Sequence, residues 1–213
     1  MLDDTLVLNM PGMYPFMDGA TQRVRDFSGY GNHGTPGNFA GNGAEYVEGL
    51  HGQSVLFDGV NQYITYGNDV SLQTLLATIE IWVTWPTAQA AWRAIVAKQY
   101  AFTIYLNGGA LGYYDWAAPA FRNSGITLTT GIPHHIVHTY NDGRSTGSLY
   151  LDGENILTAA FNISDQTRNV IIGSTNGTIE HFGGYVHKAN LHSREMGLSE
   201  IRNRYKKVRR LFD

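Results

Sequence analysis

Residues 78–85 alternate strictly between apolar and mixed positions, and this pattern constrains the fold more than any other. Every odd position in the run is Ile, Val or Trp, whereas Glu80, Trp82 and Thr84 occupy even positions. Successive side chains of a β-strand point to opposite faces of its sheet, so the run predicts a strand with one apolar face. Pro86 ends the strand, because proline has no N–H to donate to a neighbouring strand.

Short runs of the same kind recur along the chain, separated by turn residues. We expect further strands at residues 6–8, 54–57, 62–66, 92–98, 102–106, 110–114, 134–140, 147–151, 155–160, 168–173 and 179–188. Asp152-Gly153 is a strong signal for a hairpin turn, and we expect residues 58–61 to close a second hairpin. Residues 28–53 are expected to form one long loop. Strands at this density predict an all-β fold, a two-sheet antiparallel β-sandwich of the jelly-roll type.

The C-terminal segment reads differently. One short helix is expected there, because Leu198, Ile201, Tyr205 and Val208 recur at spacings of 3, 4 and 3 residues and share one face.

The charge of the chain is unevenly distributed. Six basic residues and one aspartate give residues 202–213 a charge of +5; the whole chain carries −3, so the rest carries −8. We expect this basic helix and tail, about residues 198–213, to dock on an acidic protein partner; the alternative is an ordinary solvated helix face. The predicted docking residues are Arg202, Lys206, Lys207, Arg209, Arg210 and Phe212. Nucleic acid is a poorer candidate, because the body is acidic and no aromatic and basic groove accompanies the tail.

An ordered set of short motifs spans about residues 6–205. It comprises Asp26-Phe-Ser-Gly-Tyr-Gly-Asn-His-Gly34, Val55-Leu-Phe-Asp-Gly59, Tyr63, Thr78-Ile-Glu-Ile-Trp-Val83, Leu149-Tyr-Leu-Asp-Gly153, Val170-Ile-Ile-Gly173 and Leu198-Ser-Glu-Ile-Arg-Asn-Arg-Tyr205. In this order and spacing the set resembles the laminin-G-like branch of the concanavalin A-like lectin/glucanase superfamily. The resemblance implies one concanavalin A-like domain over residues 1–213, with a fold that usually binds ligands rather than transforming them.

Some relatives in that superfamily cleave glucans, using acids placed on one strand face as Glu-x-Asp-x-x-Glu. No such run occurs, and Glu80 has no second acid at the neighbouring positions of its strand. Retaining cleavage needs two carboxylates about 5 Å apart. We therefore expect no hydrolase activity and interpret Glu80 as a residue on the sheet surface. The histidines at 134, 135 and 138 are not expected to converge, because the first and last lie roughly 13 Å apart on one strand and the middle one faces the other side.

Residues 112–121 are rich in aromatic side chains and lie outside the superfamily pattern. Sugars stack on aromatic faces while an acid or amide holds their hydroxyls, so Tyr114, Asp115 and Trp116 are candidate glycan-binding residues. Trp92, beside a Pro/Ala/Gln loop, is a fourth candidate. Exposed aromatic residues also anchor protein interfaces. The alternative for each ring is packing inside the sandwich.

Calcium is the metal to consider as a cofactor, because it prefers carboxylate and carbonyl oxygens in flexible loops. Asp26 and Asn32 lie among glycines in one loop, and Asp58 and Asn61 form a second group. The alternative is that Asp26 and Asp58 cap turns by accepting backbone hydrogen bonds.

The chain has no stretch of 18 apolar residues, and its acidic start lacks the basic region of a signal peptide. We therefore expect a non-catalytic binding or structural module in the virion of a bacterial virus, as a capsid decoration or tail-associated protein made in the host cytoplasm. Its partners would be other virion proteins or surface glycans, and self-association into a homo-oligomer stays open. One alternative is a carbohydrate-binding module of an extracellular bacterial protein. The other is a glucanase-type hydrolase, which the missing acid pair disfavours.

Overall fold

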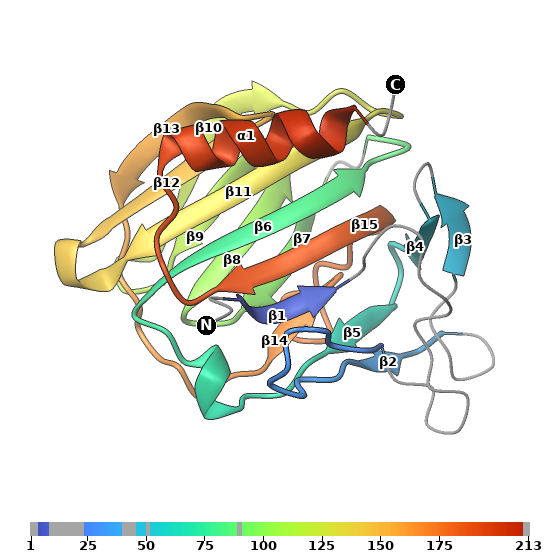
Figure 1. The fold of residues 1–213 in the computed structure, drawn as a ribbon, viewed down its shortest axis with the longest axis horizontal. Helices are drawn as coiled ribbons and strands as arrows, with labels where there is room; N and C mark the ends of the chain where they lie inside the picture. The colour runs from blue at the N-terminus through green and yellow to red at the C-terminus, as the bar shows by residue number, and fades with distance from the viewer. Residues whose placement is uncertain (1–3, 9–23, 40–45, 50–51, 89–90, 211–213) are drawn as a thin grey trace.

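The computed structural model describes residues 4–8, 24–39, 46–49, 52–88 and 91–210. Their strands form two antiparallel sheets that pack face to face, and one α-helix lies across the outer side of one sheet (Figure 1). This is the two-sheet jelly-roll sandwich with a short C-terminal helix that the sequence predicts. No helix in the described part of the chain is long and apolar enough to cross a membrane.

The first sheet has eight strands, and its centre is built from strands far apart in the sequence. In spatial order they are β13 (Glu154–Ala160), β12 (Thr146–Leu151), β11 (Pro133–Asn141), β6 (Leu76–Thr84), β15 (Gly183–His192), β4 (Gly52–Asp58) and β3 (Tyr46–Gly49), with β1 (Asp4–Leu8) paired to β15. The turn between β12 and β13 confirms the hairpin signal, since Asp152 and Gly153 both have positive φ, as a type I′ turn requires.

The second sheet has seven strands. In spatial order they are β10 (Ala120–Thr127), β9 (Ala110–Asp115), β8 (Phe102–Asn107), β7 (Trp92–Lys98), β14 (Val170–Ile172), β5 (Tyr63–Thr65) and β2 (Thr35–Gly37). Within the described residues, two short 3₁₀ helices, η2 (Val70–Leu72) and η3 (Asp142–Arg144), lie in connections between strands.

Three local predictions were wrong. Residues 58–61 do not close a hairpin, because β4 belongs to the first sheet and β5 to the second. Residues 28–53 are not a continuous loop, since they contain β2 and β3. The strand expected at 179–188 begins and ends four residues later, as β15, and β10 was not expected at all. In each case the pairing partner, which local sequence does not specify, decides the outcome.

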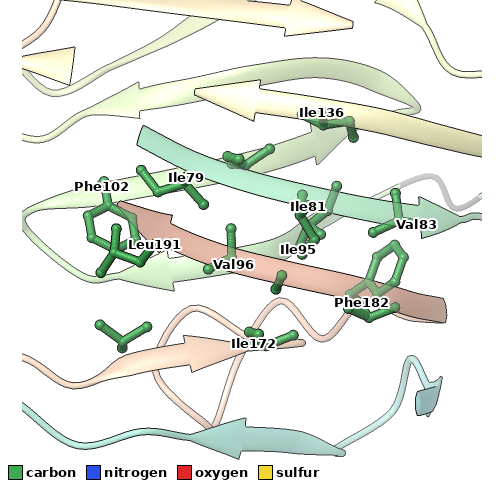
Figure 2. Packing of buried hydrophobic residues seen from close by; sticks show 14 of the residues in the cluster. Ile79, Ile81, Val83, Ile95, Val96, Phe102, Ile136, Ile172, Phe182 and Leu191 are labelled. Atoms are coloured by element: carbon green, nitrogen blue, oxygen red, sulfur yellow. The ribbon is translucent and has the colours of Figure 1, made fainter. Parts of the chain in front are cut away.

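The core lies between the two sheets and is filled by the apolar faces that the alternation predicts. Ile79, Ile81 and Val83 of β6 point toward Ile95 of β7 and Ile172 of β14 (Figure 2). All five side chains are at most 2% exposed. Burying a side chain of this size stabilises the fold by about 1.5–3 kcal/mol.

The helix α1 (Leu198–Arg209) covers the outer side of the eight-stranded sheet, which we call the covered face (Figure 1). Its apolar residue Ile201 is fully buried in a cluster with Val137, Tyr150 and Met196. Gly153 has a positive φ and lies against the ring of Tyr205, so the β12–β13 turn packs directly under the helix. Of the predicted 3-4-3 face, Ile201 is buried and Tyr205 and Val208 are half-buried, whereas Leu198 is exposed.

Candidate functional site

The outer side of the seven-stranded sheet, which we call the open face, carries a cluster of large aromatic residues. The aromatic cluster consists of Trp92, Tyr105, Tyr114, Trp116 and Phe121. Ring centroids lie 5.3 Å apart for Trp92 and Tyr105, 5.0 Å for Trp92 and Phe121, and 4.6 Å for Tyr114 and Trp116. Tyr105 is buried, but the other four side chains remain half-buried. The sheet thus holds a rigid, partly exposed apolar platform outside the core.

Small residues beneath the aromatic cluster leave room for its rings, which meet mostly edge to face. Ala94 and Ala97 of β7 are fully buried under it. A Cβ added at Gly112 would come within 2.4 Å of the Phe121 ring, so glycine is needed for that ring to cross β9. Trp116 Nε1 donates a hydrogen bond of 3.1 Å to Thr103 Oγ1, which fixes the indole.

The structure brings three of the four predicted ligand residues together and separates the fourth. Trp92, Tyr114 and Trp116 belong to the aromatic cluster. Asp115 does not join them, because it alternates with Tyr114 along β9 and is fully buried. Its carboxylate accepts a hydrogen bond of 2.7 Å from Arg122 Nη2.

A polar cleft of about 350 Å³ adjoins the aromatic cluster on the same sheet. Its lining residues are Gln99, Thr167, Arg168, Asn169, Ile171, Thr175, Asn176 and Thr178. Buried Ile171, from β14, and Thr175 form its floor, whereas most of the others are exposed. The cleft is therefore a shallow, solvent-open site lined by amides, hydroxyls and one guanidinium.

One direct contact, and one chain of contacts through Tyr100, connect the cleft with the aromatic cluster. Tyr105 Oη lies 2.7 Å from Thr175 Oγ1 and donates a hydrogen bond of 2.8 Å to Glu180 Oε2. Burial raises the pKa of Tyr105 far above its ordinary value, so its hydroxyl stays a donor. On the other side, the Arg168 guanidinium lies 5.2 Å from the centroid of the Tyr100 ring, whose own centroid is 5.3 Å from that of Trp116.

The covered face holds a different polar cluster, centred on Glu80 of β6. Glu80 is fully buried, which contradicts the sheet-surface position expected for it. Its Oε1 lies 3.0 Å from His135 Nε2, and its Oε2 lies 3.3 Å from His192 Nε2. Asn190 Nδ2 and Arg204 Nη1 donate further hydrogen bonds to Oε2, of 3.1 and 3.0 Å. We call these five residues the Glu80 network.

Electrostatics keeps Glu80 ionised. Burial alone would raise the pKa of Glu80, but hydrogen bonds from His135 and His192, together with the charge of Lys188, hold that pKa well below its usual range. Above the network, Trp82 stacks on Tyr205 of α1 with ring centroids 5.9 Å apart. The helix therefore excludes water from the network, and the alternation missed the burial because it could not show what covers this face.

Comparisons with known proteins find the same two-sheet architecture in a family model and in solved structures. A laminin-G family model, described as the concanavalin A-like lectin/glucanases superfamily, matches residues 58–202. The chain belongs to this superfamily. No curated protein sequence is similar enough to count as a relative.

Several solved structures share the fold of this superfamily member. The binding domain of Paraclostridial Mosquitocidal Protein 1 has a TM-score of 0.74 at 15% identity, over 98% of this chain and 53% of that one. Domain 4 of an extracellular GH43 arabinanase from Geobacillus stearothermophilus, in complex with arabinotriose, has a TM-score of 0.66 at 15% identity, over 84% and 90%. Trypanosoma rangeli sialidase in complex with sialic acid has a TM-score of 0.74 at 14% identity, over 97% and 33%. The chain thus spans about half of the toxin binding domain and a third of the sialidase.

The histidines of β11 take separate positions in this superfamily fold, as expected. His134 Nδ1 lies 2.9 Å from Asp152 Oδ2 at the hairpin turn, and His135 joins the Glu80 network. His138 is buried in the core with its ring centroid 4.5 Å from that of Tyr113. Burial lowers the pKa of His138 to about 3, so it is neutral.

The two predicted calcium loops are held by internal hydrogen bonds. The Asp26 carboxylate accepts hydrogen bonds from Ser28 and from Asn32 N, the latter of 2.9 Å. Asp58 Oδ1 accepts bonds from the backbone N–H of residues 60, 61 and 62, and Asn61 is one of these donors. Within the described residues, no group of three His, Cys, Asp or Glu side chains is placed to hold a metal ion. Calcium binding at Asp26, Asn32, Asp58 and Asn61 stays a prediction.

The predicted docking residues of the basic segment have different roles. Arg202 forms an exposed ion pair with Glu154 on β13, and Arg209 lies in the last turn of α1. Lys206, Lys207 and Arg210 are exposed and form no ion pair within the described part of the chain. Phe212 lies outside the described residues.

Sequence reasoning missed the cleft and the Glu80 network for one reason. Both are assembled from segments that are distant along the chain: the cleft joins residue 99 to residues 167–178, and the network joins β6, β11, β15 and α1. No local signal marks either one: even in the register of β6 and β11, Glu80 lies opposite Val137 and His135 lies opposite Trp82.

Proposed function

We propose that this protein is a non-catalytic, lectin-like module that binds glycans on its open face. The observation that carries the proposal is the half-buried aromatic cluster with a polar cleft beside it, on a sheet that α1 leaves uncovered. Aromatic rings pack against the C–H faces of sugars, and amides and hydroxyls satisfy sugar hydroxyls. Ligand sites commonly combine apolar walls with a few such polar groups.

The comparisons support this proposal at the level of similar architecture. The similar structures include a toxin binding domain and an arabinanase domain in complex with arabinotriose. At 15% identity their ligands do not transfer to this chain, so the ligand class rests on the open face itself.

The absence of catalysis in the proposal rests on Glu80. A glycosidase needs one carboxylic acid with a raised pKa and a second carboxylate across the scissile bond. The pKa of Glu80 is instead lowered, and its oxygens accept hydrogen bonds beneath α1, where a glycan has no access. This residue is suited to fixing the helix rather than to protonating a leaving group.

The proposal is tested by a glycan array followed by calorimetry with the glycan that binds best. We expect Trp116→Ala to weaken binding at least about tenfold, the scale of an aromatic contact at an interface centre. Tyr185→Ala is the matched control, because Tyr185 is a half-buried aromatic residue on β15, in the other sheet. An equal loss of affinity in both variants, or an unchanged affinity in both, would contradict glycan binding on the open face.

The setting we propose for this binding is the surface of a bacterial virus particle, with the basic segment docked on an acidic neighbour. The exposed cations Lys206, Lys207 and Arg210 support a docking role, since they form no ion pair within the described residues. Mass spectrometry of purified particles should detect the protein. Deleting residues 206–213 should reduce its incorporation while leaving the fold intact, because Ile201 and Tyr205 remain to hold α1. Normal loading of the truncated protein contradicts the docking role, and absence of the full-length protein from particles contradicts the virion setting.

A further inference from the structure

We propose that the polar cleft is a subsite for a carboxylate-bearing sugar unit, next to a unit that stacks on Trp116. This inference rests on the proposed glycan-binding function and names the chemical class of the ligand. It is carried by the hydrogen-bonding state of the side chains that line the cleft.

The lining side chains hold hydrogen-bond donors that the protein itself does not use. Gln99, Arg168 and Asn169 make no hydrogen bond within the described part of the chain, although Arg168 packs on Tyr100. The Asn176 amide oxygen accepts hydrogen bonds from Thr178 N and Oγ1, of 3.0 and 2.7 Å. This arrangement fixes the Asn176 side chain and leaves its NH₂ group for a ligand.

Polar residues in other loops of the molecule are in a contrasting state. Asp26, Asp58 and Asp69 accept backbone hydrogen bonds within their own turns. Asn123 Oδ1 does the same for Gly125 N. Such local bonds are the ordinary structural use of these residue types. Asn176 also makes such a local bond, so the contrast rests on Gln99, Arg168 and Asn169, whose side chains make no hydrogen bond within the described residues.

The donors in the cleft outnumber the acceptors, and this imbalance selects the ligand. Arg168 carries five N–H donors and no acceptor, and the Asn176 oxygen is already occupied. A neutral sugar offers hydroxyls that both donate and accept, whereas a carboxylate only accepts. Arginine binds carboxylates through two parallel hydrogen bonds, which gives geometric specificity as well as affinity. The cleft thus fits a carboxylated sugar better than a neutral one.

Two acidic side chains lie near the cleft, and both are engaged. Thr167 N and Oγ1 donate hydrogen bonds to Asp165, and these bonds, with a smaller effect of the Arg168 charge, lower the pKa of Asp165. Asp165 forms no ion pair with Arg168 within the described residues. Glu180 Oε2 accepts hydrogen bonds from Tyr105 and Thr175. The Arg168 guanidinium therefore stays available to an incoming anion.

The cleft is also linked to the aromatic cluster through Tyr100, and this link sets the size of the ligand. Arg168 packs on Tyr100, and Tyr100 packs edge-on against Trp116. A sugar unit stacked on Trp116 would place its neighbour beside Arg168. The ligand is accordingly a chain of at least two units, one of them acidic.

The test is an array of matched pairs, in which each acidic oligosaccharide is printed beside its carboxyl-reduced form. We expect the wild-type protein to prefer the acidic member about tenfold or more, the effect of a charge-assisted hydrogen bond. Arg168→Gln should abolish that preference while retaining binding to the reduced form, and Arg168→Lys should keep part of it. Lys207→Gln is the control for general electrostatic attraction, because it removes an exposed cation from α1 on the covered face.

The outcomes separate this inference from the proposed function. Equal binding to both members of every pair, or an unchanged preference in Arg168→Gln, overturns the acidic subsite and leaves glycan binding standing. A preference that Lys207→Gln reduces as much as Arg168→Gln also overturns it. Failure to bind any member of any pair overturns the subsite and the glycan-binding function together.

Discussion

The two outer faces of the sandwich use polar residues in opposite ways. On the covered face, Glu80 is enclosed by α1 and accepts hydrogen bonds from four neighbouring side chains. On the open face, Glu180 is half-buried and anchors the cleft through Tyr105 and Thr175, while donors beside it stay unused. The carboxylate of Glu80 is enclosed and fully hydrogen-bonded, which stabilises the fold, although His135 Nδ1 and Asn190 Oδ1 beside it are buried without a partner within the described residues. Accessible donors without a partner are available for a ligand. The difference indicates that the covered face holds the helix and the open face binds.

The largest expected effect comes from removing the carboxylate of the covered face. Glu80→Ala would leave Arg204 and two histidines without their shared acceptor, and breaking such a buried ionic group costs about 3–5 kcal/mol. Glu180→Ala is the matched change on the open face and should cost about 1 kcal/mol, because Tyr105 keeps Thr175 as a partner. Urea unfolding at neutral pH measures both. Equal losses would show that the two faces do not differ as described.

The contrast between the faces also shows where sequence reasoning stops. Alternation at 78–85 predicted β6 and its core face, because a period of two is a property of the strand itself. It could not show that the second face is covered, so Glu80 was placed at the surface and not in a network. The helix was predicted from its apolar spacing, but its position over Trp82 and Glu80 depends on β6, β11 and β15, which come together only in the fold.

On the open face, the sequence predicted which aromatic residues gather but not every residue that lies with them. Aromatic residues near 112–121 and Trp92 pointed to a platform, and the structure does gather Trp92, Tyr114 and Trp116 there. Asp115 was grouped with them by sequence proximity, although strand alternation places it on the other side of β9. The turn at 58–61 was misread for a related reason, since a turn signal does not show whether the chain returns to the same sheet.

The second effect is a pH dependence of stability that arises in the core between the sheets. It comes from His138, which lies on β11 with His135. Burial lowers the pKa of His138 to about 3, below its ordinary 6.5. The unfolded chain therefore binds a proton that the folded chain does not, and stability present above pH 6.5 is lost as the pH falls toward 3. The slope is about 1.4 kcal/mol per pH unit, or about 2 kcal/mol between pH 6.5 and 5. His138→Phe should flatten this part of the stability curve, and an unchanged slope in urea titrations would contradict the assignment.

Calcium, if it binds, would stabilise the loops that carry Asp26 and Asp58 rather than either outer face of the sandwich. Asp58 is the better ligand of the two loop acids, because its Oδ2 makes no hydrogen bond within the described residues while Asp26 uses both oxygens. For a dissociation constant on the order of 0.1–1 mM, several millimolar calcium would stabilise the protein by about 1–2 kcal/mol. Thermal melts with calcium and with chelator measure this, and Asp58→Asn should remove the difference. Identical melting temperatures in the wild-type protein would eliminate the metal.

The smallest effect on stability is expected from breaking the ion pair between Glu154 and Arg202, which lies on the same helix that covers the Glu80 network. Arg202 and Arg204 lie two residues apart on α1, yet Arg204 reaches buried Glu80 while Arg202 pairs with exposed Glu154. Water solvates the Arg202–Glu154 pair fully, so its attraction is screened and opposed by the entropy of two long side chains. Arg202→Ala should therefore leave the urea midpoint unchanged, whereas Arg204→Ala should lower it clearly. If the two substitutions lowered the midpoint alike, enclosure by the helix would not be what makes the covered face stable.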